Sequence, residues 1–193
     1  MSCGSSASAL YYQPVSDSHA TLVVGLGNPI LGDDGIGWRI ADAVRSALAD
    51  NGSGRKNVEI ACYALGGLSL MERLIGFDRA IIIDAVQTAS GNPGQIYDLR
   101  LSELPDYSAG HLTAAHDTSL QTALKLGQEM GAKLPSEIRV VGIEADKVYD
   151  FSEKLSPAIE AAIPQATQLV LRELDEVRSQ KVDLAGADGP AAI

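Results

Sequence analysis

Cysteine is scarce in this sequence, and long apolar runs are missing. Only two of the 193 residues are cysteines, too few for a disulfide framework or a thiolate metal cluster. The longest apolar stretches are about six residues, whereas a membrane-spanning helix needs about 20. The Ser-rich start has no basic region followed by an apolar run, so it does not resemble a secretory signal. We therefore expect a cytoplasmic protein that does not bind membranes.

Basic residues are also few. The chain has 15 Lys and Arg against 25 Asp and Glu, a formal net charge of −10 at pH 7. The field of such a molecule repels nucleic acids, so none is expected as a partner. The chain also lacks the G-x-S-x-G, H-E-x-x-H, C-x-x-C and Walker lysine motifs, and with them the chemistries that those motifs support. We expect the protein to be a monomer.

One domain accounts for most of the chain. With 193 residues, 46% of them hydrophobic, the sequence is long enough to bury a core but short for two domains. Residues 1–18 and 179–193 are small, polar and unable to bury enough apolar surface to offset the entropy of ordering. We expect these to be a flexible leader and a flexible tail around a single domain at residues 19–178.

Strand and helix patterns alternate along this domain. The connection between residues 86 and 95 is too short for a helical crossover, so the strand after it is expected to pair antiparallel. Pro164 is expected to kink or restart the final helix, residues 156–177. These patterns predict an α/β three-layer sandwich, phosphorylase/hydrolase-like, with helices on both faces of a mostly parallel, twisted sheet. Its five or so strands are predicted at residues 21–27, 58–65, 80–86, 95–101 and 138–145.

The loop after the first strand is rich in glycine but does not fit dinucleotide binding. A G-x-G-x-x-G motif starting at Gly25 would need a small residue at position 30, where Ile30 stands. Asp33 and Asp34 follow, and one of them is explained as a cap of the next helix. The other is harder to explain, because two carboxylates at one strand end repel each other unless a cation or proton lies nearby.

A further acid closes the apolar run at residues 81–83. Asp84 stands at the carboxyl end of an expected central strand, where parallel sheets bind ligands. It is either hydrogen-bonded to loop N–H groups or part of a site. Together with Asp34 and a histidine it would form an O,O,N set suited to a divalent transition metal. His111 and His116 lie in the long polar loop, whereas His19 is expected to be uninvolved.

Three segments of the chain resemble the NiFe-hydrogenase maturation proteases, also called hydrogenase maturation endopeptidases. They are VVGLGNPILGDDGIGWRIADAV, AIIIDAV and AHDTSLQTAL, within residues 21–174. The resemblance implies that Asp34, Asp84 and His116 are both the metal ligands and the catalytic residues. Some relatives carry Glu where this chain has Asp34. His111 is a rival to His116, which is favoured because its H-D-T-S-L run matches the family's helix start.

The resemblance also implies an activity. The protease would remove the C-terminal extension of the hydrogenase large-subunit precursor after nickel insertion, and it would recognise the nickel carried by that substrate. Another divalent cation would take the place of nickel when substrate is absent. The peptidase would be of an aspartyl or metal-assisted type, and either a carboxylate or the metal would activate the water.

Two alternatives remain open at this stage. Peptidyl-tRNA hydrolases share the V-G-L-G-N-P segment, but here I-L-G-D-D-G-I-G follows it in place of that family's catalytic segment, and the −10 charge disfavours tRNA. A non-catalytic chaperone that binds nickel or the precursor would need the same three ligands.

Overall fold

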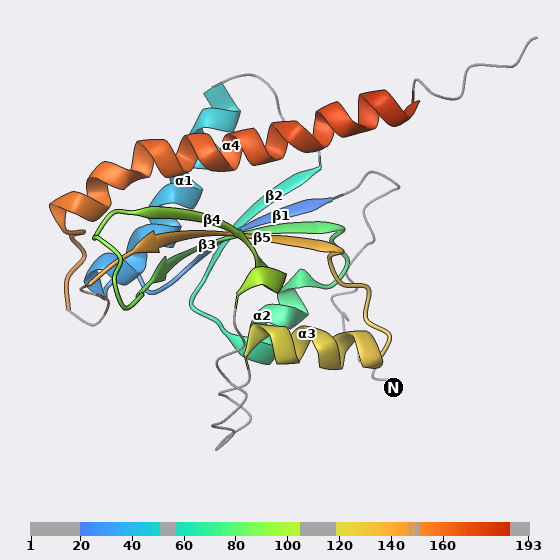
Figure 1. Ribbon diagram of the computed structural model, residues 1–193, viewed down its shortest axis with the longest axis horizontal. Coiled ribbons are helices and arrows are strands. Elements are labelled where there is room, and N and C mark those ends of the chain that lie inside the picture. The colour runs from blue at the N-terminus through green and yellow to red at the C-terminus, as the bar shows by residue number, and fades with distance from the viewer. Residues whose placement is uncertain (1–19, 51–56, 105–118, 147, 149–150, 186–193) are drawn as a thin grey trace, which may run out of the picture.

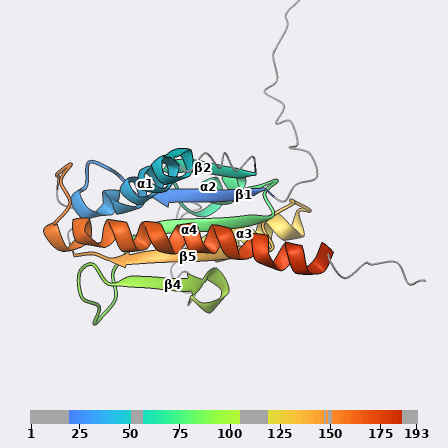
Figure 2. The same cartoon turned by 90° about the horizontal axis from the view of Figure 1, so that it is seen from above.

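The computed structural model describes residues 20–50, 57–104, 119–146, 148 and 151–185 (Figure 1). One five-stranded sheet runs through the centre, in the order β2-β1-β3-β5-β4. Its strands are β1 (Thr21–Leu26), β2 (Val58–Tyr63), β3 (Arg79–Val86), β4 (Ile96–Arg100) and β5 (Glu137–Glu144). All neighbours pair parallel except β4, which runs antiparallel to β5 at the sheet edge (Figure 2). The predictions of a mostly parallel sheet and of an antiparallel neighbour are confirmed.

Helices cover both faces of the sheet, as predicted. On one face lie α1 and α4, and on the other lie α2 and α3 (Figure 1). Two short 3-10 turns, η1 and η2, follow β1 and β4 respectively. The bounds are η1 (Gly32–Gly35), α1 (Ile36–Asp50), α2 (Gly67–Leu74), η2 (Leu101–Glu103), α3 (Leu120–Glu129) and α4 (Pro157–Ala185). The three-layer α/β sandwich is therefore confirmed.

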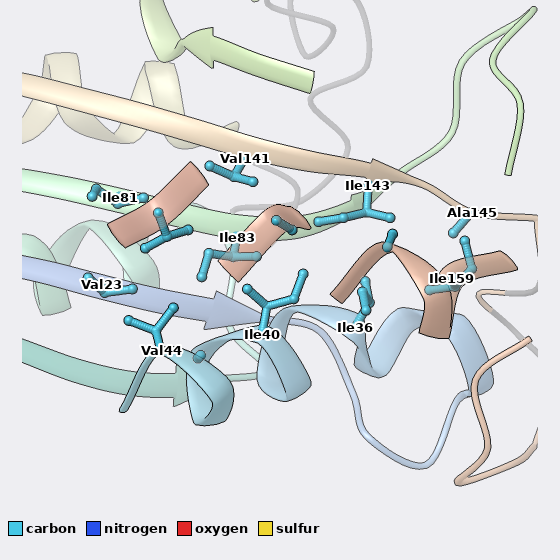
Figure 3. Close-up of a cluster of buried hydrophobic side chains, with 14 of the residues drawn as sticks. Val23, Ile36, Ile40, Val44, Ile81, Ile83, Val141, Ile143, Ala145 and Ile159 are labelled. Carbon is cyan, nitrogen blue, oxygen red and sulfur yellow. The ribbon is translucent and has the colours of Figure 1, made fainter. Parts of the chain in front are cut away.

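Alternation along the strands divides the core into two clusters. Successive strand side chains point to opposite faces, so Ile81 and Ile83 of β3 pack under α1 and α4, whereas Ile82 packs against α2 and α3. Figure 3 shows the first cluster, to which α1 contributes Ile40 and α4 contributes Ile159. Burying one such side chain contributes about 1.5–3 kcal/mol, so both faces hold their helices firmly.

The strand order places a topological switch point between β1 and β3. The chain leaves β1 through α1 toward β2 on one side, whereas α2 brings it back across to β3 on the other side. Loops that leave neighbouring strands in opposite directions open a crevice at the carboxyl ends of those strands, where ligands bind in this class of fold. The acids that follow β1 and end β3 therefore share the favoured position.

The final helix differs from the prediction. It runs unbroken through Pro164 and ends at Ala185, so it does not restart at the proline and it passes the boundary expected at residue 178. Pro164 and Glu160 both lie on the exposed side of α4. Water can therefore satisfy the Glu160 carbonyl, which the missing proline N–H leaves unpaired. None of the helices in the described part of the chain has the length and apolar character that crossing a membrane requires.

A buried ion pair lies at the opposite, amino edge of the sheet. The Arg79 guanidinium donates to a carboxylate oxygen and to the backbone carbonyl of Glu173 on α4, both at 2.6 Å. It also donates to the Glu137 carboxylate at 3.1 Å. Because a buried charge without a partner is costly, this pair fixes α4 to the sheet far from the switch point.

Candidate functional site

The loop after β1 packs unusually closely against the strand ends. Gly27 has a φ of +114°, and a Cβ there would lie 1.8 Å from the carbonyl oxygen of Asp34. A Cβ on Gly37 would lie 2.2 Å from the carbonyl oxygen of Leu26 and 2.5 Å from that of Ile83. Close backbone approach thus explains the glycine density of this loop.

Replacing Gly37 should therefore damage the fold. The Gly37→Ala substitution would drive its new methyl group into two backbone carbonyls that cannot give way, so we expect a loss of about 3 kcal/mol or more in the free energy of unfolding. Gly66 is the matched control, because a Cβ there would meet nothing within 4 Å, and Gly66→Ala should cost about 1 kcal/mol or less. Urea unfolding measures both; equal effects would contradict the close packing.

Asp34 is held by its own loop. Its Oδ2 accepts a hydrogen bond from the backbone N–H of Asn28 at 2.6 Å. Its backbone N–H donates to the carbonyl of Leu31 at 3.2 Å. Both contacts orient the half-buried carboxylate within the tight turn at the end of β1.

Asp84 lies half-buried near the end of β3, opposite Gly142 of β5. Burial first, and then the negative charge of Asp34, raise the pKa of its carboxyl group to about 7, against a smaller lowering by the backbone N–H of Ala85. The two acids thus lie at the same edge of the sheet, Asp34 in the turn after β1 and Asp84 near the end of β3. Asp84 holds a proton far more readily than an ordinary aspartate does.

Asp33, the acid next to Asp34, does not cap the helix that follows it. Asp33 is only 1% exposed, and its two carboxylate oxygens accept hydrogen bonds from the backbone N–H and the hydroxyl of Ser156, at 2.6 and 2.9 Å. Asp34 binds the Asn28 N–H. The prediction that one of the two acids caps the following helix is wrong, because Asp34 binds an earlier N–H of its own loop and Asp33 binds the segment at the start of α4.

A fourth acid lies at this edge of the sheet, and it was not predicted from the sequence. Glu144 closes β5, is 2% exposed, and accepts hydrogen bonds from the Thr88 N–H at 2.7 Å and from the Thr88 and Tyr97 hydroxyls at 2.9 Å. Burial alone would raise the pKa of Glu144, but these hydrogen bonds hold it below its ordinary value. The signal was available, since an acid ends the apolar run of β5 just as Asp84 ends that of β3.

The histidines lie outside the described residues, His116, His111 and His19 included. No group of three His, Cys, Asp or Glu side chains within the described ranges could hold a metal ion. The role of His116 as third ligand thus stays a prediction. The helix that follows it is described, and the Ser119 hydroxyl caps α3 by accepting from the Thr122 N–H at 3.1 Å.

Fold and site together define an α/β protein with paired acids at the switch point of its sheet. The family model of the hydrogenase maturation proteases, HycI, matches residues 40–173. Hydrogenase 2 maturation protease of Escherichia coli K12 is 31% identical over 157 residues, covering 80% of this chain and 90% of that protein. The hydrogenase expression/formation protein HupD of Rhodobacter capsulatus is 27% identical over 161 residues, covering 83% of this chain and 74% of that protein.

Solved structures agree with the family match. The hydrogenase maturating endopeptidase HybD of Escherichia coli superimposes with a TM-score of 0.63 at 26% identity, over 82% of this chain and 93% of that one. A hydrogenase 2 maturation peptidase of a Thaumarchaeota archaeon gives a TM-score of 0.55 at 28% identity, over 80% of this chain and 97% of that one. The chain belongs to the hydrogenase maturation protease family, and its class of activity is that of a peptidase. The matched residues 40–173 include Asp84 and His116 but not Asp34.

Proposed function

We propose that this protein is the endopeptidase that removes the C-terminal extension of a NiFe-hydrogenase large-subunit precursor after nickel insertion. It recognises the nickel carried by the substrate through Asp34, Asp84 and His116. The observation that supports this most directly is that Asp34 and Asp84 lie at the carboxyl ends of the neighbouring strands β1 and β3, where the negative charge of Asp34 raises the pKa of Asp84.

The chemistry of the two acids suits a divalent cation. Carboxylates held close together repel each other, and an ion bound between them removes that repulsion. Two oxygen ligands and one imidazole nitrogen leave coordination positions open for groups of the substrate. Because ligands must be deprotonated, engaging the ion releases the proton that Asp84 holds below about pH 7. A water or peptide carbonyl beside the ion is then polarised for hydrolysis.

A cleavage assay tests this function. Purified precursor is prepared with and without nickel, incubated with the protein, and analysed on a denaturing gel. We expect a shortened large subunit only from the nickel-loaded precursor. A stable complex without shortening would instead assign a chaperone role, and equal shortening of nickel-free precursor would contradict recognition through nickel.

A further inference from the structure

The segment between β5 and α4 holds the loop that carries Asp34. The backbone N–H of Gly32 donates to the Ser152 carbonyl at 2.6 Å, and the Ser152 N–H donates to the Ile30 carbonyl at 3.1 Å. Ser156 donates its N–H and its hydroxyl to the Asp33 carboxylate. We call these four hydrogen bonds the clasp. They join η1 to the start of α4, although the two segments are far apart in the sequence.

The turn that carries Asp34 needs support from outside itself. It is η1, a 3-10 turn of four residues with no side-chain cap of its own. The hydrogen bonds of Asp34 itself go to Asn28 and Leu31 of the same loop. Asn28 follows Gly27, whose N–H donates to the Tyr63 carbonyl of β2 at 3.2 Å, so Asn28 stays at the strand ends if η1 shifts. None of these bonds ties η1 to the start of α4.

The clasp provides that tie. The start of α4 is a firm support, because Ile159 within its first turn is fully buried in the core under the sheet. Asp33 adds a negative charge at the amino end of this 29-residue helix, where the helix dipole favours an anion. Both oxygens of the buried Asp33 carboxylate are engaged by Ser156, so this side chain is not directed at a ligand.

We propose that Asp33 is a positioning residue, which keeps Asp34 in place at the carboxyl end of β1 by holding η1 to the start of α4. Two adjacent aspartates thus have different roles, one structural support and one contact with the substrate's nickel. The activity readout for this inference rests on the proposed function, whereas its spectroscopic readout does not.

Identical substitutions at the two neighbours separate these roles. Asp33→Asn keeps the shape of the side chain, and the Ser156 hydroxyl can accept from the new amide, so kcat for precursor cleavage should stay within about threefold of wild type. Asp33→Ala removes both acceptors and should lower kcat about 100-fold with little change in KM, the effect of a misplaced reactive group. Asp34→Asn should abolish cleavage although it makes the same chemical change as Asp33→Asn.

The amide proton of Asn28 reports the position of Asp34 without any substrate. In wild type its short hydrogen bond to the Asp34 carboxylate should move its NMR resonance strongly downfield. Asp33→Ala should move this resonance upfield and speed its hydrogen exchange, and Asp33→Asn should leave both nearly unchanged. Glu173→Gln is the control, because it weakens the buried ion pair at the opposite edge of the sheet and should leave the Asn28 resonance and kcat unaffected.

The outcomes decide the inference and the function separately. A wild-type protein that cuts no precursor refutes the proposed function, while the Asn28 resonance still tests the clasp. An unchanged Asn28 resonance in Asp33→Ala, or an equal loss of kcat in Glu173→Gln, overturns the positioning role. If Asp33→Ala does not fold, Ser156→Ala provides a second test, because it removes one hydrogen bond of the clasp. The Asn28 resonance should then shift upfield to a smaller degree, and Ser156→Thr should restore the wild-type signal. No shift in Ser156→Ala would overturn the inference.

Discussion

Asp34→Asn, Asp84→Asn and His116→Ala should each lower the rate of precursor processing by at least about 100-fold. Losing an outer-shell partner of a metal ligand already costs 10–100-fold, so losing a ligand that touches the substrate's nickel should cost more. The fold should survive, because Asp34 and Asp84 are half-buried at the mouth of the sheet and outside both core clusters. Processing is measured as the rate at which shortened large subunit appears.

His111→Ala is the matched control for the histidine. It removes an imidazole five positions before His116 in the same loop, and processing should stay within about twofold of wild type. Full processing by Asp84→Asn would remove Asp84 from the mechanism. A severe loss in His111→Ala together with full activity in His116→Ala would transfer the third ligand to His111.

Asp84→Asn should make the metal-free protein more stable above neutral pH. The pKa of Asp84 rises from 3.8 to about 7 in the folded protein, so between these values the folded state keeps a proton that the unfolded state loses. Stability contributed by this group is complete below pH 4 and is lost as pH rises through 7. At about 1.4 kcal/mol per unit of pKa, the loss reaches roughly 4 kcal/mol at pH 8, and the amide avoids it.

Urea unfolding of wild type and variant at pH 4, 6 and 8, with a chelator present, measures this difference. The two proteins should be nearly equal at pH 4, and the advantage of Asp84→Asn should grow through pH 6 to pH 8. Asp34→Asn should show a smaller advantage, because it removes the repulsion by Asp34 but not the burial of Asp84. A variant that is less stable than wild type at pH 8 would show that Asp84 is satisfied as a carboxylate in the folded protein.

The sequence predicted those features that depend on local pattern. Apolar runs with β-branched residues indicated the strands, and the short connection after Val86 indicated the antiparallel partner of β5. The placement of Asp34 and Asp84 at one edge of the sheet followed from a general rule, since the carboxyl ends of the parallel strands β1 and β3 lie side by side. Neither prediction required knowledge of which side chains touch.

Features that depend on distant partners could not be predicted. Asp33 and Ser156 are separated by 123 positions, and an acid before a helix is most often a cap, so the local interpretation was reasonable and wrong. Pro164 shows the same limit, because whether a proline interrupts a helix depends on whether the freed carbonyl faces water. The position of Glu144 was visible in the sequence, but its hydrogen bonds were not, because its partners, Thr88 and Tyr97, come from a different loop and strand.

The position of a bound ion tests the account most directly. A crystal structure of the protein soaked with Ni²⁺ should show one ion bound by Asp34, Asp84 and the imidazole of His116, each ligand atom about 2 Å from it. An ion bound elsewhere, or a His116 imidazole more than about 10 Å from the two carboxylates, too far for them to share one ion, would contradict the proposed site.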